Sequence, residues 1–105
     1  MLEAEGFFVV RAAKSGYPDL IALKTTRKFA CECKAGEEGV FIDKPMFGRM
    51  LAWEQQTGLP VFLAWKLSRQ EWKFFPLKFL KETERGFSLG KGDLGAGMTF
   101  AQAVG

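Results

Sequence analysis

Residues 18–34 have the sequence PDLIALKTTRKFACECK, and this stretch decides the fold. The segment 19–23 consists mainly of strand-forming residues, and Pro18 suits the first position of a strand. A second strand is predicted over 28–34, where the side chains alternate in character. Because only a short polar segment separates the two strands, they predict a β-hairpin that turns at Thr25–Thr26.

The register of this hairpin follows from its turn. With Thr25–Thr26 at the centre of a two-residue loop, Lys24 faces Arg27, and counting outward places Asp19 opposite Glu32. Successive side chains of the second strand point to opposite faces of the sheet. One face carries Phe29, Cys31 and Cys33, and the other carries Ala30, Glu32 and Lys34.

The opposed pair of Asp19 and Glu32 predicts a metal site. Like charges facing each other destabilise a sheet unless a cation lies between them. Mg²⁺ prefers one or two carboxylates together with water and phosphate, so these two residues are its predicted ligands, with Mn²⁺ as a substitute. Lys34 shares a face with Glu32 and is placed to orient water or to stabilise charge on a phosphate. This pattern indicates metal-assisted phosphodiester hydrolysis.

The same spacing also fits a reading without chemistry. On the open face of an antiparallel hairpin, the three residues would be solvated, with Lys34 paired to a carboxylate.

Composition limits the other possibilities. The chain has 105 residues, of which 48% are hydrophobic, so it has room for one folded domain and for no separate domain that binds a small-molecule cofactor. Fifteen Lys and Arg residues against twelve Asp and Glu, with a pI near 9.0, favour an anionic partner such as nucleic acid. The absence of His, with only two Cys, excludes a His-based triad and a four-ligand zinc site.

The sequence contains no run of eighteen apolar residues and no signal-peptide pattern, which predicts a cytoplasmic protein without a membrane partner. Cys31 and Cys33 are too close in one strand to form a comfortable disulfide. Because both share the apolar face with Phe29, they are interpreted as buried core thiols and not as a redox or metal pair.

The remaining predicted elements flank the hairpin on both sides. Asp43 is the predicted N-cap of the main helix, and Pro45 suits its first turn. The predicted elements are a helix end at Leu2–Glu5, strands at Phe7–Val10, Val40–Ile42, Val61–Lys66 and Glu71–Phe75, and helices at Lys44–Thr57 and Leu77–Glu82.

The glycine-rich composition after residue 85 predicts a change in organisation. Residues 1–85 are expected to form the single catalytic domain, and residues 86–105 a mobile tail with a short terminal helix at Thr99–Val104.

Pro18–Asp19 followed by Glu32–Cys33–Lys34 resembles the PD-(D/E)xK signature of the restriction-endonuclease-like nucleases. The similarity extends, in order, to the pattern of archaeal-type Holliday junction resolvases over roughly residues 2–76. The further matching segments are Gly6–Arg11, Ser15, Lys44, Gly48–Arg49 and Pro60–Ala64.

The resemblance implies an α/β restriction-endonuclease-like core, with a central mixed β-sheet of about five strands flanked by helices. It also implies a homodimer with two active sites, magnesium, and symmetrical nicking of four-way DNA junctions. By similarity, Asp19 and Glu32 are the metal ligands and Lys34 is the catalytic lysine. Arg11 and Ser15 fall where the family places a basic residue and a loop serine needed for DNA cleavage.

The chain departs from the family pattern at its first helix, which is expected to be truncated. Family members carry a glutamate on a longer first helix, where it approaches the metal. Glu3 and Glu5 are candidates to replace it, although neither occupies the family position.

Two surfaces are predicted around the site. Six basic residues in loops, turns and helix starts are expected to contact DNA phosphates without reading bases: Lys14, Lys24, Arg27, Lys28, Lys44 and Arg49. The apolar arc of the helix at 44–57 spans about 160°, wider than a one-sided core contact needs. Met46, Met50 and Trp53 are therefore predicted to line a dimer interface, the alternative being that Trp53 completes the core.

These observations lead to one main hypothesis and several alternatives. The main hypothesis is a structure-selective, magnesium-dependent endonuclease that resolves four-way junctions in branched double-stranded DNA. The alternatives are a PD-(D/E)xK nuclease acting on flaps or duplex DNA, a catalytically weak junction-binding module, and a structural protein without affinity for nucleic acid.

Overall fold

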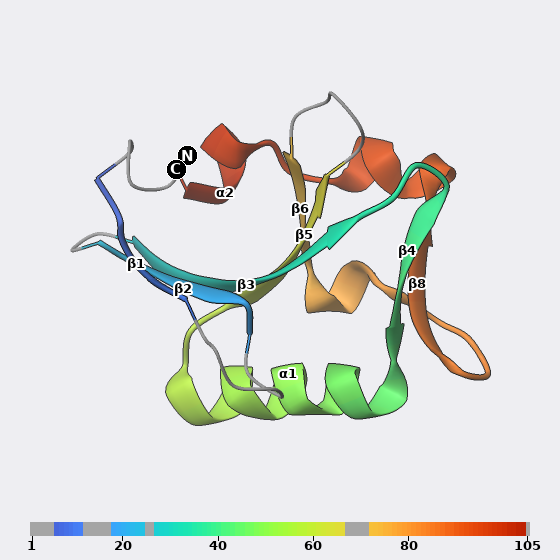
Figure 1. Ribbon diagram of the computed structural model, residues 1–105, viewed down its shortest axis with the longest axis horizontal. Helices are drawn as coiled ribbons and strands as arrows, with labels where there is room; N and C mark the ends of the chain where they lie inside the picture. The colour runs from blue at the N-terminus through green and yellow to red at the C-terminus, as the bar shows by residue number, and fades with distance from the viewer. Residues whose placement is uncertain (1–5, 12–17, 25–26, 67–71, 105) are drawn as a thin grey trace.

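The computed structural model describes residues 6–11, 18–24, 27–66 and 72–104. Its main sheet has five strands in the order β1-β2-β3-β5-β6, in which β3 and β5 are parallel and the other neighbours antiparallel. The strands are β1 (Phe8–Arg11), β2 (Leu20–Lys24), β3 (Arg27–Ala35), β5 (Val61–Lys66) and β6 (Trp72–Pro76). The predicted mixed five-stranded sheet is therefore confirmed (Figure 1).

The central hairpin has the predicted register. Lys24 pairs with Arg27, and the pairing continues to Leu20 opposite Cys31. One further step along both strands places Asp19, which directly precedes β2, beside Glu32 of β3.

Helix α1 (Lys44–Thr57) has the predicted bounds and caps. The Asp43 side chain accepts a hydrogen bond of 2.8 Å from the Met46 backbone N–H, which satisfies one of the free donors of the first turn. Gly58 ends the helix with a φ of 74°, a left-handed conformation that glycine adopts without strain. No helix in the described ranges is long and apolar enough to cross a membrane.

The main sheet is covered on both faces. Helix α1 lies on one side, and the short helix α2 (Phe100–Val104) lies on the other (Figure 1). Alternate residues of β3 therefore enter two different cores: Ala30 packs with Met50 and Leu63 beneath α1, whereas Cys31 packs with Phe62 and Ala103 beneath α2. The face that carries Ala30, Glu32 and Lys34 is thus apolar at Ala30 and polar from Glu32 onward.

The prediction of a mobile tail after residue 85 is wrong. Residues 86–90 form β8, the middle strand of a second sheet with order β4-β8-β7. Gly86 allows this pairing, because a Cβ at its position would come within 2.2 Å of the Ile42 carbonyl oxygen. The additional elements are β4 (Gly39–Asp43), β7 (Lys81–Glu82), β8 (Gly86–Gly90) and the 3₁₀ helices η2 (Leu77–Phe79) and η3 (Lys91–Ala96).

The boundary predicted after residue 85 is consequently wrong as well. Leu89 and Ala103 are fully buried, one in each core, so residues 86–104 belong to the folded domain. The helix predicted over Leu77–Glu82 is also too long, because η2 ends at Phe79 and β7 follows it.

Arg27 connects the start of β3 to the end of the chain. Its Nε and Nη2 donate hydrogen bonds of 3.0 and 2.7 Å to the Ala103 carbonyl oxygen. We expect Arg27→Met to lower the free energy of unfolding by about 1–2 kcal/mol, because a charged donor is lost and the carbonyl oxygen is left unpaired. Denaturant unfolding measures the change; Lys28→Met, an exposed neighbour, is the control, and equal effects of both variants would contradict the role of Arg27.

Candidate functional site

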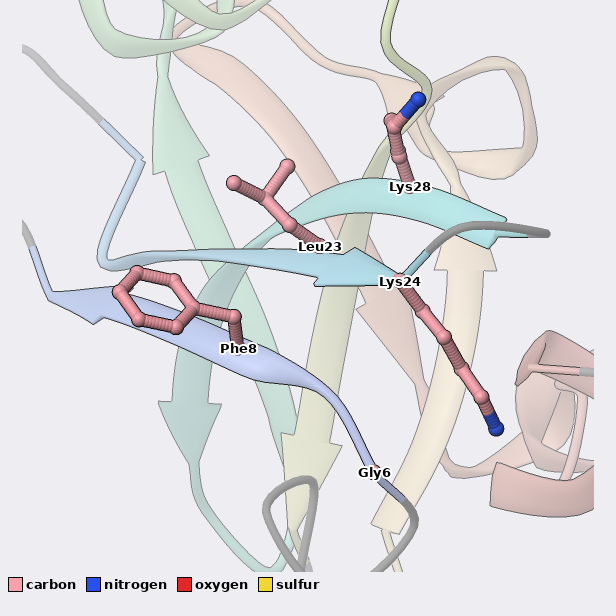
Figure 2. A pocket seen from close by; sticks show the side chains of 5 residues that line it. All are labelled: Gly6, Phe8, Leu23, Lys24 and Lys28. Carbon is pink, nitrogen blue, oxygen red and sulfur yellow. The ribbon is translucent and has the colours of Figure 1, made fainter.

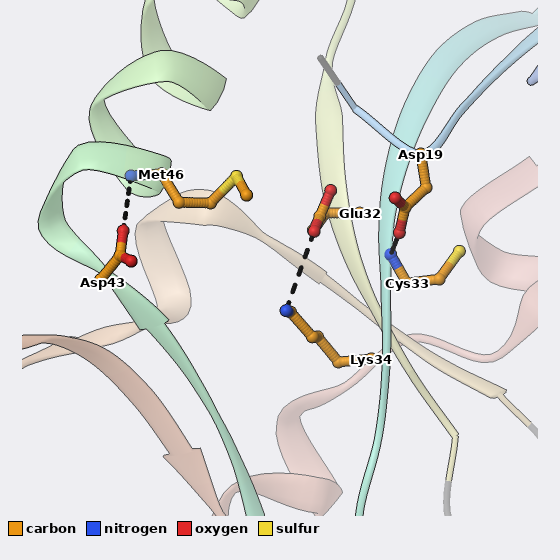
Figure 3. A network of polar contacts seen from close by, with 6 residues as sticks. All are labelled: Asp19, Glu32, Cys33, Lys34, Asp43 and Met46. Carbon is orange, nitrogen blue, oxygen red and sulfur yellow. Dashed lines mark hydrogen bonds and ion pairs between the residues drawn. The ribbon is translucent and has the colours of Figure 1, made fainter. Parts of the chain in front are cut away.

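Asp19 directly precedes β2 and lies beside β3. Pro18 before it is buried, while Asp19 itself is exposed. Its Oδ2 accepts a hydrogen bond of 2.8 Å from the Cys33 backbone N–H, which holds the carboxylate against β3 (Figure 3). This contact could not be predicted from the sequence, because a backbone donor has no signature in the residue types.

Glu32 is the buried charged residue of the main sheet. Only 4% of it is exposed, and its Oε1 has no hydrogen-bond partner among the described residues. Burial, followed by repulsion from Asp19, raises the pKa of the Glu32 carboxyl above its ordinary value of 4.5, while Lys34 and the Asp19 backbone oppose the rise. Asp19 and Glu32 are thus close enough to repel one another.

Lys34 lies on the same side of β3 as Glu32 (Figure 3). Its Nζ is 3.9 Å from Glu32 Oε2, a long ion pair, and 38% of its side chain is exposed. The ammonium therefore reaches solvent while remaining beside the buried carboxylate. A group in this position can hold an anionic substrate against the site.

The two carboxylates fit a hard divalent cation. An unpaired, buried carboxylate oxygen is costly unless something binds it, and Glu32 Oε1 is such an atom. The described residues contain no cluster of three or more His, Cys, Asp or Glu side chains that could hold a metal ion. Two carboxylates completed by water and phosphate suit Mg²⁺ better than a metal that needs a full protein cage.

Arg11 approaches the same region from β1. Arg11 pairs with Leu20, the residue after Asp19, and it is exposed. Its positive charge lowers the pKa of the Cys33 thiol, although burial and the nearby carboxylates dominate and raise that pKa to about 11. The structure thus places Arg11 near Asp19 and Cys33.

Four predicted positions lie outside the described residues. They are Ser15 and Lys14 in the segment 12–17 and Glu3 and Glu5 in the segment 1–5. The predicted helix end at Leu2–Glu5 and the truncation of the first helix fall in the same undescribed segment.

The predicted DNA contacts have different surroundings. Lys28 and Arg49 are exposed. Lys24 is also exposed, and its Nζ lies 5.3 Å from the centre of the Phe7 ring. Lys44 forms a surface ion pair with Glu82, with 3.8 Å between Nζ and Oε2. Arg27 requires correction, because its half-buried guanidinium is bound to the Ala103 carbonyl oxygen and its role in the described structure is structural.

The dimer interface predicted on α1 also requires correction. Met50 is fully buried in the core of its own chain, so it cannot contact a partner. Met46 and Trp53 are half-buried and pack against that core, and Phe47 stacks on Phe87 of β8 with 3.7 Å between ring centres. The wide apolar arc of α1 is therefore explained largely by contacts within the chain, several of them with β8.

The two cysteines are free, with Cys31 buried and Cys33 half-buried beneath α2. Burial raises the pKa of the Cys31 thiol far above its ordinary range. Both thiols are therefore protonated at neutral pH, as expected of core residues.

Comparison with known proteins gives consistent results. A family model described as "Archaeal holliday junction resolvase (hjc)" matches residues 1–104. A curated relative, the crossover junction endodeoxyribonuclease Hjc of Archaeoglobus fulgidus, is 27% identical over 106 residues, covering 95% of this chain and 78% of the relative. The solved structure of Archaeoglobus fulgidus Hjc, described as a Holliday junction resolvase from an archaeal hyperthermophile, superposes with a TM-score of 0.88, 27% identity and coverage of 95% of this chain and 83% of that one.

Proposed function

Since the chain belongs to the archaeal Holliday junction resolvase family, we propose that it is a magnesium-dependent endonuclease that resolves four-way DNA junctions. The observation that carries the proposal is the buried Glu32 carboxylate, with one unpaired oxygen, beside Asp19 and Lys34. Among the described residues, this constellation combines paired acids with a partly exposed cation. The relative named as a crossover junction endodeoxyribonuclease supports the choice of substrate.

The side chains have distinct roles in this proposal. Asp19 and Glu32 would hold Mg²⁺, which when bound would activate water and neutralise charge on the phosphate. Lys34 holds the scissile phosphate and stabilises the negative charge that develops on its oxygens. Arg11, at the end of β1, binds the neighbouring backbone phosphate and fixes the register of the strand to be cut.

We further propose that the active form is a homodimer. Cutting a junction symmetrically requires two sites related by a two-fold axis. On α1, Leu51 is exposed and Met46 and Trp53 are half-buried, so these three residues, and not Met50, are the candidates for partner contacts. We place this activity in the cytoplasm, as the sequence predicted.

Two alternatives start from the same site. Another PD-(D/E)xK nuclease would cut flaps or duplex DNA as well as junctions. A binding module would bind junctions and never nick them, because two protein carboxylates alone would hold the metal too weakly.

A panel of DNA substrates tests the proposal. We expect nicking of a four-way junction with Mg²⁺, none with EDTA, and cleavage of a linear duplex of the same sequence that is slower by about 10²-fold or more, because the site contacts backbone shape and not bases. Gel assays with end-labelled strands measure this selectivity. Equal cutting of duplex and junction would support a general nuclease, and tight junction binding without any nicking would support the binding module.

A further inference from the structure

A surface hollow at the outer edge of the main sheet is separate from the carboxylate site. It is lined by Gly6, Phe8, Leu23, Lys24 and Lys28 (Figure 2). Phe8 pairs with Leu23, and Leu23 pairs with Lys28, so these three side chains come from adjacent strands and share one face of the sheet. An aromatic ring, an aliphatic side chain and an ammonium group therefore lie in a row across β1, β2 and β3.

The packing of the described residues does not account for Phe8. It is 70% exposed, more than any other large hydrophobic residue among those described, whereas its neighbour Phe7 is 5% exposed and belongs to the core. Exposing a phenylalanine ring forgoes the stabilisation of burial. An aromatic ring in this position offers an open face to a ligand.

The chemistry around Phe8 identifies the class of ligand. Lys28 is exposed on the same face, and Lys24 closes the hollow beside Gly6, where its stem comes within 3.7 Å of a Cβ at that position. An aromatic platform with an ammonium group on the same face of the sheet suits a nucleotide, whose base stacks on the ring while its phosphate binds the cation. A second copy of the chain fits less well, because a two-fold contact through Phe8 would also bring like-charged lysines together.

The position of the hollow suits the DNA that enters the carboxylate site. Lys28 and Glu32 are four residues apart on the same face of β3, which corresponds to roughly 13 Å along the strand. This is about four base steps of duplex DNA at 3.4 Å each. A nucleotide about four steps from the phosphate at the carboxylate site is therefore within reach of the hollow.

We propose that Phe8 and Lys28 form a stacking site for an unstacked nucleotide near the branch of the junction, a contact that selects branched over linear DNA. The inference rests on the proposed function, because it takes branched DNA as the substrate. The ring covers the base, and the lysine holds the adjoining phosphate. The carboxylate site then acts on a phosphate several nucleotides away.

Binding measurements in Ca²⁺ or EDTA, where no cutting occurs, test the proposal. We expect Phe8→Ala to weaken binding to a four-way junction about tenfold and binding to linear duplex less than twofold, because the stacking contact is specific to the branched DNA. Phe8→Trp restores binding and Phe8→Leu does not, because only the former keeps an aromatic face. Lys28→Ala reduces the slope of log affinity against log salt by about one unit.

The chain provides a matched control in Phe79 and Lys78 of η2. Phe79 is 43% exposed, with Lys78 Nζ 5.7 Å from its ring centre, so Phe79→Ala and Lys78→Ala remove an equivalent pair from another surface. These variants are expected to bind junctions as the wild type does. A direct readout is photo-crosslinking of junctions with iodouracil near the branch, in which Phe8 is the expected adduct.

Other results would overturn the proposal. Equal loss of duplex and junction binding on Phe8→Ala, full rescue by Phe8→Leu, or a change from dimer to monomer in sedimentation would each show that Phe8 does not stack on a base. Failure of the proposed function is distinguishable, because wild-type protein would then either nick no DNA in Mg²⁺ or cut linear duplex as readily as the junction. A wild type that resolves junctions while Phe8→Ala binds them normally would reject the stacking site alone.

Discussion

Asp19→Asn is expected to lower the rate of junction nicking by about 10³-fold or more while junction binding is retained. The amide oxygen of asparagine can still accept the hydrogen bond from the Cys33 backbone N–H, so the connection between β2 and β3 is preserved. The negative charge that helps to hold a divalent cation is lost. Rates under single-turnover conditions in saturating protein, with dissociation constants measured in Ca²⁺, separate chemistry from binding.

Asp93→Asn is the matched control for this variant. The Asp93 carboxylate also accepts a backbone N–H at 2.8 Å, from Gly90, but it pairs with Lys81 and lies apart from Glu32. The Asp93→Asn variant should nick junctions at the wild-type rate. Loss of junction binding by Asp19→Asn in parallel with nicking would contradict a metal-binding role and indicate a folding defect instead.

Much of the fold could be predicted from local patterns in the sequence. The hairpin register depends on the length of the turn and on the alternation of side chains, and both involve residues close in sequence. The pairing of Lys24 with Arg27 could therefore be predicted. The bounds of α1 could also be predicted, because Asp43 and Gly58 act through contacts within one helical turn.

The errors arise where contacts span a long stretch of sequence. Glycines at 86–97 suggested a mobile tail, yet Gly86 is required by its close approach to the Ile42 carbonyl oxygen. Because β8 was not predicted, the apolar arc of α1 was interpreted as wider than a contact with its own core requires, and Met50 was assigned to a dimer interface. Arg27 was misassigned for a similar reason, since its partner lies 76 residues away.

The candidate site shows the same division. The sequence predicted that Asp19 lies beside Glu32, and that Lys34 shares a face of the strand with Glu32. It could not show that Glu32 is buried with an unpaired oxygen, because burial depends on the packing of the whole sheet.

Glu32→Gln is expected to lower the rate of nicking by about 10³-fold or more. The same substitution is expected to raise the melting temperature of the metal-free protein at pH 8. Burial and repulsion from Asp19 make the ionised carboxylate unfavourable in the folded state, so removing its charge stabilises the fold. Mg²⁺ should raise the melting temperature of the wild type, because a ligand that binds only the folded state stabilises it, and should have little effect on Glu32→Gln. Glu54→Gln is the control: Glu54 accepts a 2.7 Å hydrogen bond from the Val61 N–H, and its substitution should give no such gain.

The pH dependence of stability provides a second, independent measurement on Glu32. Because its folded pKa lies above the ordinary value of 4.5, the folded state holds more protons than the unfolded state between these two pKa values. Stability without metal should therefore fall as pH rises through this window, and Glu32→Gln should flatten the change. Asp93 has the opposite effect on the pH dependence of stability, and at lower pH. Its pKa is lowered from 3.8, mainly by the hydrogen bond with Lys81, so its ionised form stabilises the fold and is lost as the pH falls through the lowered pKa. A wild-type protein whose metal-free stability is level over the window, or a Glu32→Gln variant that melts below the wild type at pH 8, would show that the carboxylate is satisfied without a cation.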